Sequence, residues 1–180
     1  MLLQRDQSCL LIVDVQERLT PVMTDPRRVI HHCHLLIRAA QRLGVPVIAS
    51  EQYPKGLGPT IIDLRQLLPA SDILPKLHFS AAADPAILAR LSQLNRPQIV
   101  MAGIEAHVCV LQTALDLKAR GFSPAVIADA CASRRPDSEK MAWDRLLQQD
   151  VTLATVEMAL FEWLYQAGTP EFKELSALIR

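Results

Sequence analysis

Aliphatic runs of strand length alternate with stretches of helical periodicity along the chain, and this alternation restricts the possible folds more than any other feature. Strands are expected at residues 9–15, 45–50, 71–76, 97–104, 123–130 and 151–156. Helices are expected at residues 27–44, 84–95, 106–121 and 136–149, with a short helical segment before Pro69 and a helical tail. Strands that are apolar along their whole length lie buried on both faces of a sheet. The pattern therefore predicts the α/β class, with a Rossmann-like, six-stranded parallel sheet in a three-layer αβα arrangement.

The composition fits a single domain spanning residues 1–180. Half of the residues are hydrophobic, and 19 basic side chains balance 19 acidic ones. A chain without net charge lacks the electrostatic surface that nucleic acids and anionic membranes attract, so neither partner is expected. The first residues do not have the pattern of a secretory signal, and no apolar run is long enough to span a bilayer, which predicts a cytoplasmic protein.

Cysteine and histidine spacing argues against a structural metal centre. Four cysteines lie far apart and without CxxC spacing, which predicts reduced thiols rather than a disulfide framework or a zinc cluster. They are Cys9, Cys33, Cys109 and Cys131. The stretch "HHCH" at 31–34 looks like a metal cluster, yet only His31 and His34 share a face at helical spacing. Packing or surface exposure is therefore the favoured interpretation of these histidines.

Three chemically useful side chains fall at one edge of the expected sheet. Ligands of open parallel sheets bind outside the carboxyl ends of the strands. Asp14 closes the first strand, Lys76 closes the third, and Cys109 lies just past the fourth, in the first turn of its helix. A thiol, a carboxylate and an ammonium group together can perform acyl chemistry. The start of a helix also lowers a thiol pKa, so an activated Cys109 is expected.

Each of these residues also has a purely structural interpretation. Cys109 lies between apolar neighbours and is also compatible with the core. Asp14 is suited to cap the turn that follows its strand, and Lys76 alone is compatible with a solvated side chain. Their independent placement on the same edge favours the functional interpretation.

The chain resembles the isochorismatase-like cysteine hydrolases in three segments. These are "LLIVDVQERL" at 10–19, "LPKLHFSA" at 74–81 and "VMAGIEAHVCVLQTALDLKARG" at 100–121. The sequence of the third segment is most similar to those of the isochorismatase domain-containing subgroup. The resemblance implies that Cys109 is the nucleophile, that Asp14 is the general base and acid, and that Lys76 lowers the thiol pKa. It also implies a homo-oligomer acting on a small molecule.

The resemblance further implies how the backbone of the site is arranged. The peptide bond from Ile104 to Glu105 is expected to be cis, and the N–H groups of Glu105 and Cys109 are expected to form an oxyanion hole. Candidate pocket residues lie on the neighbouring segments, and for Glu51 and Gln52 a solvated loop start is the alternative. The candidates are Gln16, Glu51, Gln52, Tyr53 and Ala106.

Two departures from family patterns refine the expected chemistry. Metal-dependent nicotinamidases carry histidines after the second strand, whereas "EQYPKGLGPT" here has none. No catalytic metal and no cofactor are therefore expected. Isochorismatases that hydrolyse a vinyl ether replace the cysteine with a small residue, so the retained Cys109 favours hydrolysis of a C–N bond.

The sequence thus predicts a cysteine hydrolase that acts on a small amide or carbamoyl compound through a thioester acyl-enzyme. The alternatives are a vinyl-ether hydrolase, a redox-active thiol protein, and a catalytically idle oligomeric scaffold. The presence of all three side-chain types weighs against the idle scaffold.

Some neighbouring residues are assigned supporting places. Asp129, Cys131 and Ser133 end the fifth expected strand at the same edge, where a loop-stabilising role is expected. His107 points away from Cys109 on a helix and is expected at the surface or an interface. The tail at 169–180 and the aromatics at 160–166 are expected to cover the sheet or to build an interface.

Overall fold

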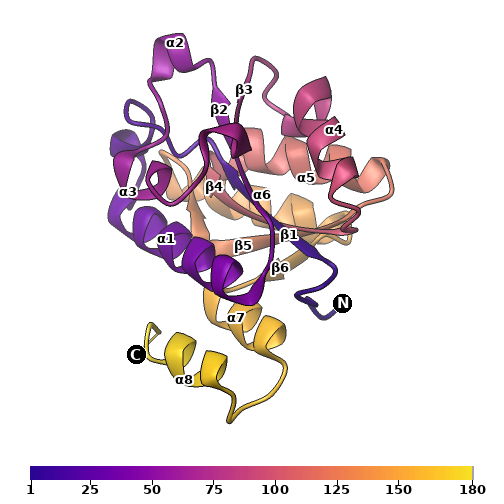
Figure 1. Ribbon diagram of the computed structural model, residues 1–180. Helices are drawn as coiled ribbons and strands as arrows, with labels where there is room; N and C mark the ends of the chain where they lie inside the picture. Colours follow the sequence, from indigo (N-terminus) through magenta and orange to yellow (C-terminus); the bar gives the residue numbers. More distant parts are fainter. Residues whose placement is uncertain (180) are drawn as a thin grey trace.

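The computed structural model, which describes residues 1–179, is built around a six-stranded parallel sheet (Figure 1). The strand order is β3-β2-β1-β4-β5-β6, so the order reverses between β1 and β4. The strands are β1 Ser8–Val13, β2 Val47–Gln52, β3 Ile73–Lys76, β4 Gln98–Ile104, β5 Ser123–Ala132 and β6 Thr152–Ala154. This arrangement confirms the predicted sheet, and the carboxyl ends of β1 and β4 form the point of reversal at which ligands of such sheets usually bind.

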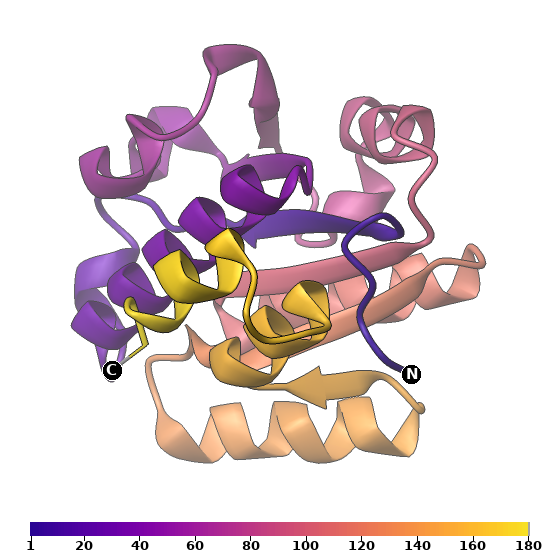
Figure 2. The ribbon, with the colours of Figure 1, turned by 60° about the horizontal axis from the view of Figure 1, so that its bottom comes forward.

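Helices cover both faces of the sheet, which confirms the three-layer arrangement. One face packs against α1 Pro26–Leu43, α7 Val156–Leu164 and α8 Pro170–Ser176, and the other against α4 Pro85–Gln93, α5 Leu111–Ala119 and α6 Pro136–Gln148. Figure 2 shows α7 and α8 beside α1, with α6 on the opposite side of the sheet. Successive residues of β1 alternate between the two cores: Leu10 and Ile12 face α1, and Leu11 and Val13 face α5.

Short helical turns lie in the segments that connect these elements. They are η1 Thr20–Val22, α2 Pro54–Leu57, α3 Ile62–Arg65, η2 Ala70–Asp72, η3 Ala81–Ala83 and the π-helical turn η4 Ala106–Val110. The helix expected at 106–121 is therefore two pieces, η4 followed by α5. Within residues 1–179, no helix combines the length and apolar character required to cross a bilayer.

Several strand ends differ from the expected ones by one or two residues, and two of these differences have identifiable reasons. The second strand begins at Val47 rather than at residue 45, because Gly44 adopts a left-handed φ of 71° and the N–H of Val45 donates to Ala40, which closes α1. The fifth strand continues to Ala132, because Cys131 and Ala132 pair with Gly103 and Ile104 beyond a bulge.

The carboxy-terminal tail packs against the outer surface of α1. Trp163 and Leu175 are buried, and Arg42 pairs with Glu171 and Glu174. Trp163, one of the aromatics at 160–166, packs in the core on this face of the sheet and donates to Ser8 Oγ in β1, whereas α8 packs against α1 and α7. Arg180, the last residue of the tail, lies outside the described residues.

Gly103 lies tightly against the backbone of Val13 in the neighbouring strand. Its φ is +124°, and it pairs with Val13 in the register of β1 and β4. A Cβ atom at this position would lie 2.1 Å from the carbonyl oxygen of Val13. Only glycine therefore fits where the two central strands end.

We predict that Gly103→Ala lowers the free energy of unfolding by about 3 kcal/mol, through backbone clash and conformational strain together. Gly121→Ala is the matched control, because Gly121 also has a positive φ, +86°, but no atom lies within 4 Å of its added Cβ. Urea unfolding of both variants measures the difference. Equal losses of stability would show that the contact with Val13 is unimportant.

Three core thiols are fully buried and stay protonated to high pH. Burial raises the pKa of Cys9 and of Cys131 to about 12, and it lifts the pKa of Cys33 well above its ordinary value. An unfolded chain releases these protons at lower pH. The folded state therefore binds more protons than the unfolded state in the alkaline range.

We predict that ionisation of these thiols does not change the free energy of unfolding near neutral pH. Between about pH 9 and pH 11 it lowers this free energy by about 1.4 kcal/mol per pH unit for each thiol. The sign follows from the raised pKa values: the contribution is complete below the pKa of the unfolded thiol and is lost as the pH rises toward that of the folded one. In Cys9→Ala the slope should be smaller by one thiol's share. Denaturant unfolding at several alkaline pH values measures the slope, and an unchanged slope would contradict this explanation.

Candidate active site

The structure brings Asp14 and Lys76 into direct contact, with Cys109 beside them. Asp14 follows β1, Lys76 ends β3, and Cys109 lies in η4, directly after β4. Lys76 Nζ is 2.7 Å from Asp14 Oδ2, and both side chains are completely buried. Cys109 is 4% exposed, and its thiol is influenced by both charges. The three elements meet because parallel strands present their carboxyl ends at one edge.

The Asp14 carboxylate is held in one orientation. Its backbone has a left-handed φ of 54°, a conformation that Asp tolerates better than most residues. Oδ1 accepts a hydrogen bond of 2.7 Å from Ser50 Oγ, and Oδ2 accepts the one from Lys76. Each carboxylate oxygen has two lone pairs, so each retains one after these bonds. The carboxylate is therefore fixed in place and still able to accept a proton.

All the N–H groups of the Lys76 ammonium face hydrogen-bond acceptors within the protein. Besides Asp14, its ammonium group donates to Gln52 Oε1 at 2.7 Å and approaches the carbonyl oxygens of Phe79 at 3.1 Å and His78 at 3.2 Å. Three N–H groups thus face four acceptors. The effect of the Lys76 charge on the thiol pKa is larger than that of a hydrogen bond from Lys76, and both lower the pKa.

The thiol pKa moves in the direction opposite to the sequence-based expectation. The pKa of Cys109 is raised to about 12, and burial is the largest cause. The Asp14 carboxylate raises this pKa by more than the Lys76 ammonium lowers it. The expectation of a lowered pKa was wrong because it considered the helix start and the lysine without the surrounding apolar core. Cys109 is thus a protonated thiol at neutral pH, next to a carboxylate.

The candidate pocket residues mostly hold the loop after β2. Gln16 Nε2 donates to the carbonyl oxygens of Gln52 at 3.0 Å and Gly58 at 2.7 Å, and Glu51 Oε1 accepts from both N and Oγ1 of Thr60. Ala106 is buried, while Tyr53 is 52% exposed. Of this group, Gln52 contacts the ion pair, through Lys76.

Three partners of the ion pair were not among the predicted site residues. They are the Ser50 hydroxyl and the backbone carbonyls that follow Lys76. Ser50 had a detectable signal, because β2 lies beside β1 and Ser50 pairs with Val13, the residue before Asp14. The carbonyls of His78 and Phe79 carried no such signal, since a carbonyl group is present at every position.

The backbone after β4 contains one peptide bond of unusual geometry, at the position where the resemblance implies it. The peptide bond between Ile104 and Glu105 is cis. The Glu105 carboxylate accepts two hydrogen bonds of 3.1 Å, from N and Nε of Arg134. Glu105 thereby ties the end of β4 to the segment that follows β5.

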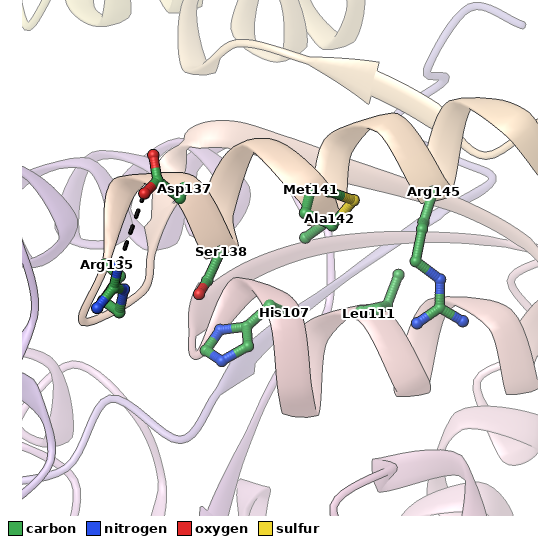
Figure 3. Close-up of a pocket in the computed structure, with 8 residues that line it drawn as sticks. All are labelled: His107, Leu111, Arg135, Asp137, Ser138, Met141, Ala142 and Arg145. Atoms are coloured by element: carbon green, nitrogen blue, oxygen red, sulfur yellow. Dashed lines mark ion pairs between the residues drawn. The ribbon is translucent and has the colours of Figure 1, made fainter.

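His107 lines a cavity of about 450 Å³ between α5 and α6 (Figure 3). Its Nδ1 is 2.9 Å from Ser133 Oγ. The lining residues are His107, Leu111, Arg135, Asp137, Ser138, Met141, Ala142 and Arg145. Because Asp14, Lys76 and Cys109 do not line it, this cavity is distinct from the candidate active site.

The remaining candidates have internal partners. Asp129 Oδ1 accepts from the N–H of Val156, its carbonyl oxygen is 2.7 Å from His32 Nδ1, and Cys131 is fully buried. His31 and His34 are on the outer part of α1. In the part of the chain that the structure describes, no three His, Cys, Asp or Glu side chains are grouped so as to hold a metal ion.

Comparisons with known proteins agree with the geometry. The isochorismatase domain model matches residues 8–158. The chain is 37% identical over 167 residues to isochorismatase domain-containing protein 1 of Salmo salar, covering 93% of this chain but only 59% of that protein. It is 36% identical over 179 residues to the secreted isochorismatase effector Isc1 of Phytophthora sojae, covering 96% and 84% of the two chains.

A solved structure extends the likeness to three dimensions. The MAR1 ribonuclease of Caenorhabditis elegans superposes with a TM-score of 0.92 and 34% identity, covering 99% of this chain and 92% of that one. A family model that spans most of the chain, with relatives more than a third identical along nearly all of it, shows that the chain belongs to the isochorismatase family, in the group of isochorismatase domain-containing proteins.

Proposed function

We propose that the protein is a hydrolase that cleaves a C–N bond of a small amide or carbamoyl compound, with Cys109 as nucleophile and Asp14 and Lys76 completing the site. The observation that carries the proposal is the buried ion pair of 2.7 Å beside a nearly buried thiol. Two charges in an apolar surrounding are costly to maintain for structure alone. Beside a nucleophile, the same pair supplies a fixed base and a fixed positive charge.

The first half of the proposed cycle forms the acyl-enzyme. Asp14 accepts the Cys109 proton as Sγ attacks the substrate carbonyl carbon, so the thiolate is formed only when it reacts. The N–H groups of Glu105 and Cys109 are proposed to stabilise the negative carbonyl oxygen of the tetrahedral intermediate. Asp14 then passes the proton to the departing nitrogen, the C–N bond breaks, and a thioester remains on Cys109.

The second half releases the product. Asp14 takes a proton from water, whose oxygen attacks the thioester carbonyl, and the C–S bond breaks as the proton returns to sulfur. Lys76 offsets the negative charge that moves between Asp14 and Cys109 in both halves. Its hydrogen bonds to Gln52 and to the backbone carbonyls keep that positive charge in one place.

Access to the site favours a small substrate. Cys109 is 4% exposed, and the two charged side chains are not exposed at all. Tyr53 is exposed on the segment that follows β2, and Leu77 and Phe79 on the segment that follows β3. We propose that a second copy of the chain covers part of this apolar rim in a homo-oligomer, which sedimentation measurements test.

We predict that Cys109→Ala abolishes turnover, because no other group replaces the sulfur nucleophile. The assay is ammonia or amine release from a panel of primary amides and carbamoyl compounds. Cys9→Ala, which changes a buried thiol on β1, is the matched control and should retain activity. Full activity of Cys109→Ala would reject the mechanism.

We also predict that Asp14→Asn abolishes turnover while speeding alkylation of Cys109 at mildly alkaline pH. The Asp14 carboxylate raises the thiol pKa, so its neutral replacement lowers that pKa and increases the thiolate fraction. Iodoacetamide labelling against pH, read by mass spectrometry, gives the midpoint for each cysteine. A midpoint that stays fixed or rises in Asp14→Asn would contradict this placement of the carboxylate.

RNA is a second candidate substrate, because the C. elegans protein is named a ribonuclease. The balanced charge of 19 basic and 19 acidic residues argues against tight RNA binding. Adding RNA to the substrate panel distinguishes RNA from small amide and carbamoyl compounds as the substrate. RNA cleavage that persists in Cys109→Ala would favour a different site. A vinyl-ether substrate whose turnover survives alkylation of Cys109 would likewise favour the isochorismatase reaction.

A further inference from the structure

Ser80 carries a buried hydroxyl group without a hydrogen-bond partner in the protein. Three buried side-chain atoms within residues 1–179 lack such a partner: Thr20 Oγ1, Arg28 Nε and Ser80 Oγ. Ser80 is 5% exposed. An unpartnered polar group in the interior costs stability, so its presence calls for an explanation in each case.

The chain on both sides of Ser80 is bound to the candidate active site. On one side, the carbonyl oxygen of Phe79 is 3.1 Å from Lys76 Nζ. On the other, the N–H of Ala81 donates a 2.8 Å hydrogen bond to Thr113 Oγ1. Thr113 lies about one helical turn after Cys109, and a helical side chain leans toward the preceding turn. Ser80 therefore lies between the Lys76 ammonium and the helix that carries Cys109.

The direction of the Ser80 side chain follows from its neighbours. Leu77 and Phe79 are 71% and 55% exposed, so these two side chains point outward from the segment after β3. Lys76 and Ser80 are buried and point inward. The hydroxyl group of Ser80 is thus on the same side of this segment as the ion pair.

Local structure does not use the hydroxyl. Ser80 precedes the turn η3, the position at which serine often caps a helix, but its side chain makes no capping hydrogen bond. The next two residues, Ala81 and Ala82, are buried alanines that pack in the same core as Cys109. An alanine at position 80 would therefore satisfy the packing without an unpartnered oxygen.

We propose that Ser80 is a substrate-recognition residue, whose hydroxyl group hydrogen-bonds the N–H of an amide or carbamoyl group bound at Cys109. A hydroxyl both donates and accepts, which matches the N–H and C=O of such a group. This proposal rests on the proposed function and narrows its substrates to compounds that carry an N–H next to the reactive carbonyl.

The test compares two alkylating probes on Cys109. Iodoacetamide carries a primary amide, and methyl iodide lacks it; in both reactions an S–C bond forms, iodide leaves and the thiol proton is lost. In Ser80→Ala, the iodoacetamide rate relative to the methyl iodide rate should fall about three- to tenfold, the share of one hydrogen bond. Equal changes in both rates, or no change, would overturn the proposal.

Thermal unfolding supplies an independent readout. Ser80→Ala should melt at the same temperature as the wild type or higher, because it removes an unpartnered hydroxyl. The matched control is Ser8→Ala: Ser8 is also buried, but its hydroxyl is bonded to Gln4, Gln98 and Trp163, so this variant should melt lower. A loss in Ser80→Ala similar to that of Ser8→Ala would show that the hydroxyl has a structural partner, and would overturn the proposal.

The wild-type protein separates the two levels of failure. If Cys109 reacts with iodoacetamide no faster than Cys9, Cys33 and Cys131 at any pH, the proposed function fails and recognition at Ser80 fails with it. If wild-type Cys109 reacts faster but the probe ratio does not change in Ser80→Ala, only the recognition proposal fails.

Discussion

The buried ion pair between Lys76 and Asp14 is the interaction on which the rest of the site depends. Taking two charges out of water costs several kcal/mol per ion, and good geometry with further hydrogen bonds is needed to offset it. Here Ser50 satisfies the carboxylate, while Gln52 and the carbonyls of residues 78–79 satisfy the ammonium. The end of β2 and the segment after β3 therefore supply the partners of the pair.

The same burial affects the protonation state of the Cys109 thiol, the nucleophile that we propose. In a reactive cysteine exposed near cations, the thiolate exists before the substrate arrives. Cys109 instead lies in an apolar surrounding beside a carboxylate, which keeps its proton in place. In the mechanism that we propose, Asp14 accepts this proton only as the thiol attacks, so no free thiolate is stored before the substrate binds.

The sheet fixes the relative positions of these groups through backbone contacts. β1 lies between β2 and β4, so Val13 pairs with Ser50 on one side and with Gly103 on the other. Without a side chain at Gly103, the ends of β1 and β4 approach closely, and η4 begins next to Asp14. The left-handed backbone of Asp14 then turns its carboxylate toward β2 and β3. Strand order therefore brings the three side chains to one edge, and the segment after β3 completes the hydrogen bonds of Lys76.

The sequence by itself determined the fold class and the edge at which the reactive side chains meet, because strand periodicity and the parallel arrangement are local and repetitive properties. It predicted six strands, the alternating helices, and the positions of Asp14, Lys76 and Cys109 at strand ends. The tertiary structure alone decided the pKa of Cys109, the partners Ser50 and Gln52, the loop-holding bonds of Gln16 and Glu51, and the unpartnered hydroxyl of Ser80. These properties depend on burial and on distances between segments far apart in the chain, and a pattern of residue types carries neither.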